Sequence, residues 1–126
     1  MTTLLVALAG GAGALTRFLT DGAIARRNRL RMPVGTVVIN VTGSFLLGLL
    51  TGLFALSSAD SSGAMVKAVV GTGFCGGYTT FSTASVESMR LWLAEGRGAG
   101  IGYAATTLVL GVAAAAAGMW IGRLLG

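Results

Sequence analysis

Residues 73–85 read GFCGGYTTFSTAS and interrupt a segment that is otherwise apolar enough to cross a membrane. The adjacent glycines Gly76 and Gly77 weaken a helix, because glycine loses more backbone freedom on folding than any other residue. Hydroxyl side chains follow at Thr79, Thr80, Ser82 and Thr83. Non-helical backbone survives at membrane depth only where protein buries it or where it lines a watery cavity. The stretch therefore predicts a broken helix, whose freed backbone groups either bond the nearby hydroxyls in a tolerated kink or face an ion.

The composition of the whole chain agrees with a membrane setting. Its 126 residues are 54% hydrophobic and only 10% charged, with a mean hydropathy of +0.82. Soluble domains carry roughly 25% charged residues. The length suits one domain, and no ten-residue alternating segments of the kind found in membrane β-barrels recur. We expect an all-α membrane protein with a single domain over residues 1–126.

Four apolar stretches approach or exceed the roughly 20 residues that a transmembrane helix needs. We predict spans at Thr2–Gly22, Val34–Ser57, Ala64–Leu93 and Ala99–Leu125, with the third interrupted near its middle. Small residues repeat at four-residue spacing in the pairs Gly48/Gly52 and Gly118/Gly122. Such pairs let helix backbones approach closely, and packing within one chain is their more probable role.

The positive charges are distributed unevenly between the two sides of the membrane. Loops one and three hold six arginines, namely Arg26, Arg27, Arg29, Arg31, Arg90 and Arg97. The opposite side has two basic residues, Lys67 and Arg123. The positive-inside rule then places loops one and three in the cytoplasm and both termini outside. Most of the +5 net charge lies in one short loop without alternating aromatic residues, so we expect no nucleic-acid partner.

The chain lacks the sets of reactive side chains that most catalytic chemistry needs. The chain has no histidine and one cysteine, Cys75, so it cannot form an internal disulfide or a cysteine-based zinc site. No nucleophile–base set, paired carboxylates or nucleotide-binding fingerprint is present. Cys75 is expected to be a buried small hydrophobe. We expect no enzymatic activity, and polar residues in apolar spans favour transport or conduction.

Two further residues are unusual for their setting. Asn40 places an amide with two N–H donors deep in the second span, within GTVVINVTGSFLLG (residues 35–48). Its alternative role is to hold two helices together. Phe81 sits among hydroxyl residues, and its electropositive ring edge could face an anion, although packing is the commoner role of a membrane phenylalanine.

These segments together resemble the Fluc (CrcB) family of bacterial fluoride channels. The resemblance rests on residues 35–48, on GTGFCGGYTTFSTASVES (residues 71–88) and on GALTR ending at Arg17, and it extends over all four spans. It implies a four-helix subunit that pairs antiparallel as a dimer in a bacterial inner or plasma membrane. Each dimer would have two fluoride pores and a central structural sodium ion. Passive conduction would export fluoride from the cytoplasm and reduce its toxicity.

The resemblance also assigns residues. Those at the pore would be Asn40, Phe81, Ser82, Thr83, Tyr103 and Thr107. The sodium ion would be held by the backbone carbonyls of Gly76 and Thr79. Apart from the resemblance, Arg17 lies near the loop-one end of its span and could snorkel or have a structural or vestibule role. We expect Glu87 to have a structural role, in which it bonds a neighbouring helix.

Two features depart from this pattern and leave alternatives open. Many family members have a second phenylalanine three residues after the first, where this chain has Ala84. The six-to-two charge bias favours one orientation, whereas an antiparallel homodimer needs both. The subunit could therefore pair with an oppositely biased paralogue, or not conduct by itself. A small multidrug exporter is a weaker alternative, because it needs a buried carboxylate and Asp21 lies only at the edge of the first span.

Overall fold

The computed structural model describes residues 1–56 and 61–126, and all regular structure in this part of the chain is helical. The first, second and fourth spans are the continuous helices α1 (Thr2–Arg27), α2 (Val34–Leu53) and α6 (Arg97–Leu125). The third span is divided into α3 (Ser62–Val66), η1 (Lys67–Cys75), α4 (Gly76–Tyr78) and α5 (Phe81–Glu95). The prediction of an all-α membrane protein with an interrupted third span is confirmed.

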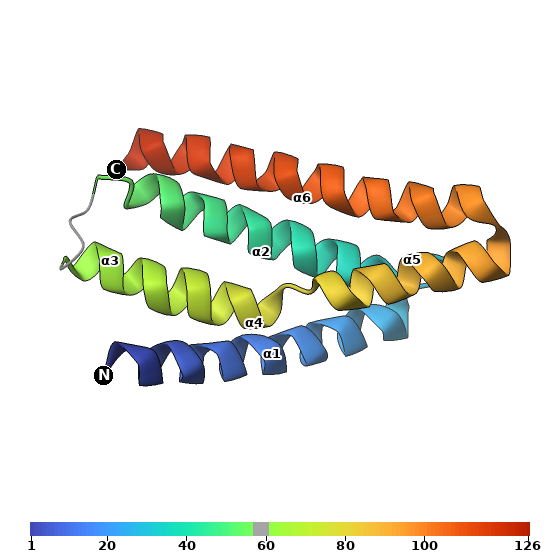
Figure 1. Cartoon of the computed structure of the whole chain (residues 1–126), viewed down its shortest axis with the longest axis horizontal. Coiled ribbons are helices and arrows are strands. Elements are labelled where there is room, and N and C mark those ends of the chain that lie inside the picture. Colours follow the sequence, from blue (N-terminus) through green and yellow to red (C-terminus); the bar gives the residue numbers. More distant parts are fainter. Residues whose placement is uncertain (57–60) are drawn as a thin grey trace.

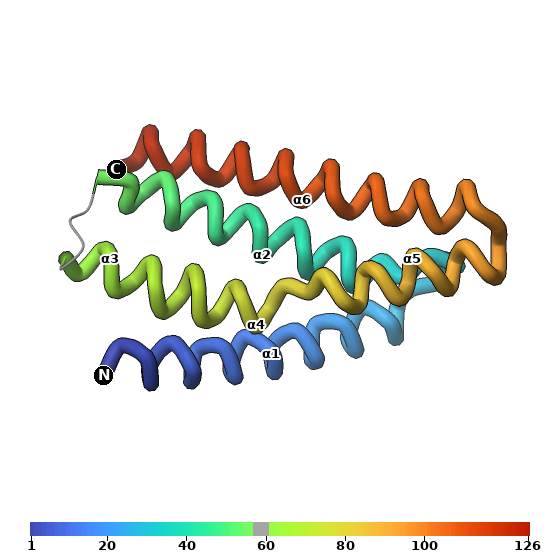
Figure 2. Tube along the Cα trace, in the orientation of Figure 1, coloured from blue at the N-terminus to red at the C-terminus, as the bar shows by residue number. Residues whose placement is uncertain are grey.

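The spans form two pairs of opposite direction (Figure 1). α1 and the third span start at the end that carries the N-terminus, and α2 and α6 start at the other end. Figure 2 shows that the C-terminus returns to the same end as the N-terminus. α1, α2 and α6 are each long and apolar enough to cross a membrane. The chain is therefore a multi-pass membrane protein whose odd-numbered loops lie on one side.

Several helix boundaries differ from the sequence prediction by two to five residues, and the largest difference is at the end of α1. α1 continues to Arg27, five residues past its expected end, because Ala23 to Arg27 are compatible with helix and the Asn28 side chain organises the turn beyond it. Asn28 Oδ1 accepts from the Leu30 N–H at 2.9 Å, and its Nδ2 donates to the Met32 carbonyl at 2.8 Å. Loop one is therefore shorter than expected. The predicted end of the second span at Ser57 lies outside the described residues.

Gly96 alone joins α5 to α6. Its φ of 101° lies in the left-handed region that favours glycine, which lets the chain reverse without a longer loop. The predicted third loop is thus reduced to one residue.

The segment η1 is a nine-residue π-helix. The π conformation has i→i+5 hydrogen bonds, is rare, and is often found beside functional sites. The hydropathy of this segment gave no indication of it. It is followed by the short helix α4, which ends at the break.

Backbone contact between α2 and α6 depends on the two predicted glycine pairs. A Cβ added to Gly48 would overlap the Ala115 carbonyl, and one added to Gly118 would overlap the Phe45 carbonyl. Gly52 and Gly122 make equivalent contacts one turn further on. These glycines are buried, so the predicted role in packing within one chain is confirmed.

The third span changes its packing partner along its length. Its first half packs on α1, where a Cβ added to Gly13 would overlap the Phe74 carbonyl and one added to Gly77 would overlap the Gly10 carbonyl. Its second half, α5, packs on α6 instead. The break lies between these two contacts.

A substitution at the α2–α6 contact tests this packing. We expect Gly118→Ala to lower the free energy of unfolding by about 1–3 kcal/mol, because its methyl group forces two backbones apart. Gly102→Ala, on the same helix but with open space around it, is the control and should be neutral or slightly stabilising. Unfolding followed by tryptophan fluorescence in mixed micelles measures both. Equal effects of the two substitutions would contradict this packing.

Candidate functional site at the break in the third span

The backbone leaves the helix at Thr79 and Thr80. Thr79 (φ −75°, ψ 160°) and Thr80 (φ −150°, ψ 121°) are extended, and the helix resumes at Phe81. Gly76 and Gly77, expected to cause the break, are themselves helical. Gly77 instead permits close contact with α1. The break was predicted correctly, but it falls after the glycines.

The Asn40 side chain pairs with the backbone of Thr80. Its Nδ2 donates to the Thr80 carbonyl at 2.9 Å, and its Oδ1 accepts from the Thr80 N–H at 2.8 Å. The amide thus supplies both bonds that a peptide group of a helix would provide. In a continuous α-helix the Thr80 N–H would donate to the Gly76 carbonyl. Because this donor is directed to Asn40, the Gly76 carbonyl is left without it.

Hydroxyl groups bond backbone groups on both sides of the break, as predicted. The buried Thr80 Oγ1 caps α5 by accepting from the Thr83 N–H at 3.2 Å. The same hydroxyl donates to Thr83 Oγ1 at 2.9 Å and lies 3.3 Å from Ser82 Oγ. On the other side of the break, Thr79 Oγ1 donates to the Cys75 carbonyl at 2.9 Å. Thr80, to which the sequence analysis gave no site role, is therefore at the centre of the cluster.

Groups from α1 and α2 hold the other side of the break. Arg17 Nη1 donates to the Thr79 carbonyl at 3.3 Å. Gly43 of α2 leaves room for the Thr79 methyl group and the Tyr78 ring, which a Cβ would overlap. Arg17 thus contacts the break directly, through the Thr79 carbonyl.

A second polar cluster surrounds Tyr103 on α6. The Tyr103 hydroxyl lies 2.7 Å from Glu87 Oε2 and 3.1 Å from the Pro33 carbonyl. Thr107 Oγ1 donates to the Tyr103 carbonyl at 2.9 Å, and both residues are buried. Glu87 therefore bonds a neighbouring helix, as the sequence analysis expected for a structural role.

The two clusters lie on one continuous strip between α2, α5 and α6. Thr80, the N-cap of α5, is followed by Thr83 and Glu87 at spacings of three and four residues, which places them along one face of that helix. On α2 the buried Thr36 precedes Asn40 by four residues, a spacing that places both on one helix face. Thr36 was not among the predicted site residues, although its spacing from Asn40 indicated a shared face.

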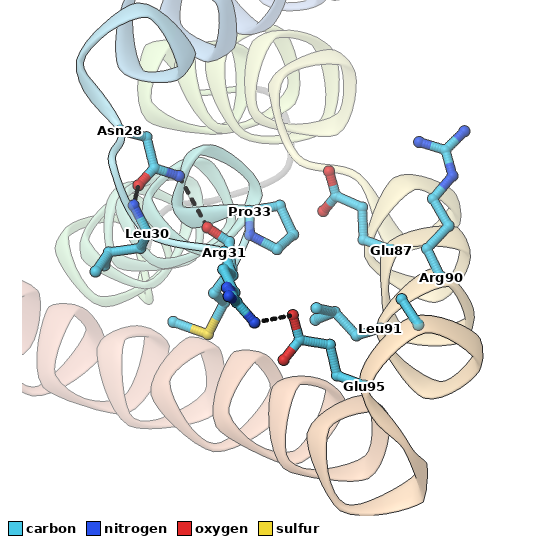
Figure 3. A pocket seen from close by; sticks show the side chains of 10 residues that line it. Asn28, Leu30, Arg31, Pro33, Glu87, Arg90, Leu91 and Glu95 are labelled. Atoms are coloured by element: carbon cyan, nitrogen blue, oxygen red, sulfur yellow. Dashed lines mark hydrogen bonds and ion pairs between the residues drawn. The ribbon is translucent and has the colours of Figure 1, made fainter.

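A cavity of about 360 Å³ opens at the Glu87 end of this strip (Figure 3). It lies between the 28–33 loop and α5, on the side that carries most of the arginines. Charged side chains of both signs line it, including Arg31, which lies 3.8 Å from Glu95. The cavity gives water access to one end of the polar strip.

The Phe81 ring lies apart from the buried strip, whereas Ser82 borders it through its Oγ, 3.3 Å from Thr80 Oγ1. Both are exposed, and the Phe81 ring is 87% exposed. Ala84, where a second ring was noted as missing, is buried. The structure therefore brings Asn40 and Thr83 together around Thr80 and Tyr103 together with Thr107, but leaves the Phe81 ring on the outer surface of the subunit.

Comparison with known proteins identifies a family and several relatives that match most of this chain. The family described as "CrcB-like protein, Camphor Resistance (CrcB)" matches residues 4–119. A protein of Cutibacterium acnes named "Fluoride-specific ion channel FluC 2" is 49% identical, with 97% of this chain and 98% of the relative covered. "Fluoride-specific ion channel FluC 1" of Leifsonia xyli is 44% identical, with 98% and 88% covered. "Fluoride-specific ion channel FluC 2" of Mycobacterium bovis is 40% identical, with 94% and 89% covered. The chain belongs to the CrcB family.

Proposed function

We propose that this protein is a fluoride-selective channel subunit that lets fluoride leave the cytoplasm passively and so reduces its toxicity. The observation that carries the proposal is the uncharged cluster at the break, where an amide, hydroxyls and open backbone meet at mid-span. The names of the relatives support fluoride as the ion. Their bacterial sources support an inner or plasma membrane location.

The chemistry of the cluster suits a small halide. Fluoride is strongly hydrated, so a narrow path must replace the donors that it loses with its water shell. Asn40 has a second N–H besides the one that bonds Thr80, and Ser82 and Thr83 carry hydroxyls. Conduction requires binding strong enough for entry and weak enough for release. Neutral donors meet both needs better than a fixed positive charge beside the ion.

The exposed position of Phe81 supports assembly with a second subunit. Its ring and Ser82 form part of a surface that lacks a second wall within one subunit. A second copy in antiparallel orientation would close the path and place the Phe81 ring edge against the ion. The partner is the same chain or a paralogue, and the numbered names FluC 1 and FluC 2 are compatible with either.

A sodium ion at the centre of the dimer is part of the proposal. The Gly76 carbonyl lacks its helical donor, and the Thr79 carbonyl lies outside the helix. Unwound carbonyls at the end of a half-helix are the ligands that membrane proteins offer to Na⁺. The ion would supply positive charge that stabilises carbonyls of two facing breaks. One subunit offers only two such ligands, so the site would need both subunits.

Fluoride efflux from liposomes tests the proposed function. Purified protein alone should release fluoride, detected by an electrode, and should not release chloride from matched liposomes. Flux with one gene product supports a homodimer with both orientations. Flux only after co-expression with a paralogue supports a heterodimer. Absence of fluoride flux in both preparations would refute the proposal.

The substitution Asn40→Asp tests the amide at the break. We expect fluoride flux to be abolished, because the carboxylate loses the donor to the Thr80 carbonyl and adds negative charge to an anion path. Asn28→Asp is the matched control, because it makes the same change in loop one and keeps the acceptor for Leu30. If Asn40→Asp conducts like the unmodified protein, Asn40 is not at the pore.

The substitution Phe81→Ile tests the exposed ring. It removes the electropositive edge but keeps an apolar side chain, and we expect about a fivefold loss of flux, since an aromatic contact contributes on the order of 1 kcal/mol. Phe18→Ile is the control, because Phe18 is also exposed, at 74%, on α1. Equal flux in the unmodified protein, Phe81→Ile and Phe18→Ile would show that the Phe81 ring is not part of the ion path.

A further inference from the structure

Arg17 carries a full charge far from the ends of its helix. It precedes the end of α1 at Arg27 by ten residues, which corresponds to about 15 Å along the axis. Charges within a membrane are costly and are usually paired. The one ion pair among residues 1–56 and 61–126 is Arg31–Glu95, so Arg17 has no carboxylate partner in the described chain.

The group that Arg17 bonds instead is the Thr79 carbonyl, at 3.3 Å. This carbonyl lies at the C-terminal end of the half-helix formed by α3, η1 and α4. The C-terminal end of a helix carries partial negative charge, so it favours a cation nearby. Arg17 thus supplies, from within the subunit, a positive charge at the end of the broken helix.

The same carbonyl is a ligand in the sodium site proposed above. A guanidinium and Na⁺ that both approach one oxygen would lie only a few ångströms apart in a medium that screens charge poorly. We propose that Arg17 and Na⁺ compete for the Thr79 carbonyl: Arg17 stabilises the break in the separate subunit, and sodium displaces it when two breaks meet. This inference rests on the sodium site of the proposed function and adds the residue that regulates its occupancy.

Competition between Arg17 and Na⁺ predicts an effect on sodium binding that would be absent if Arg17 only stabilised the break. Removal of the Arg17 charge should weaken the protein when sodium is absent, because the half-helix end loses its cation. The same change should make sodium bind more readily, because nothing opposes the ion. A residue that only supported the break would weaken the protein without improving the apparent affinity for sodium.

The experiment follows the thermal unfolding midpoint of the purified full chain in detergent while Na⁺ replaces N-methylglucamine at constant ionic strength. For Arg17→Gln we expect a lower midpoint without sodium. The sodium concentration that gives half of the stabilisation should fall at least about tenfold, because the like charge has been removed. Arg17→Lys keeps the charge and should require nearly as much sodium as the unmodified protein. Arg26→Gln removes an exposed charge from the end of α1 and is the matched control, which should behave like the unmodified protein.

The outcomes separate this inference from the function on which it rests. Equal half-maximal sodium concentrations in Arg17→Gln and the unmodified protein would overturn the competition but leave the sodium site intact. Absence of any sodium response in every variant would overturn both the site and the competition. Fluoride efflux, measured separately, would then decide whether conduction itself stands.

Discussion

The pairing of the Asn40 amide with the Thr80 backbone determines how the third span can be broken inside a membrane. An unsatisfied peptide group costs several kcal/mol in hydrocarbon, so an extended residue there needs substitutes for both of its lost helical bonds. Asn40 provides both, at 2.9 and 2.8 Å, from a different span. The break therefore exists only when α2 lies against it, which couples the local backbone conformation to the packing of the subunit.

The glycine contacts explain why a broken span suits this fold. Lipid is as apolar as leucine, so helices in a membrane associate through close packing rather than through burial from water. The first half of the third span meets α1 at Gly13 and Gly77, while its second half packs against α6. A straight helix could not follow both partners. The extended residues Thr79 and Thr80 let the chain change direction between them.

The distribution of polar groups connects this architecture to the proposed conduction. Inside the subunit, Thr80 is hydrogen-bonded to Asn40 and Thr83, Tyr103 is hydrogen-bonded to Glu87, and the Glu87 end reaches a cavity on the arginine-rich side. On its outer surface, Phe81 has no covering segment in the described chain. The polar groups inside the subunit are hydrogen-bonded, while the ring beside the break is uncovered. This arrangement suits an ion path that a second subunit completes.

Local signals in the sequence were sufficient to predict the number of spans, their alternating direction and the existence of the break, because hydropathy, charge and helix-weakening residues act locally. The sequence also indicated that hydroxyls would satisfy the freed backbone and that the paired glycines Gly48/Gly52 and Gly118/Gly122 would pack within the chain. The position of the break depends on the fold, since Gly76 and Gly77 remain helical and the extended residues are those that Asn40 and Arg17 bond. The partner of Glu87 likewise depends on contact between distant segments, and the π-helix η1 was not indicated by the sequence. No local pattern in a sequence encodes such contacts.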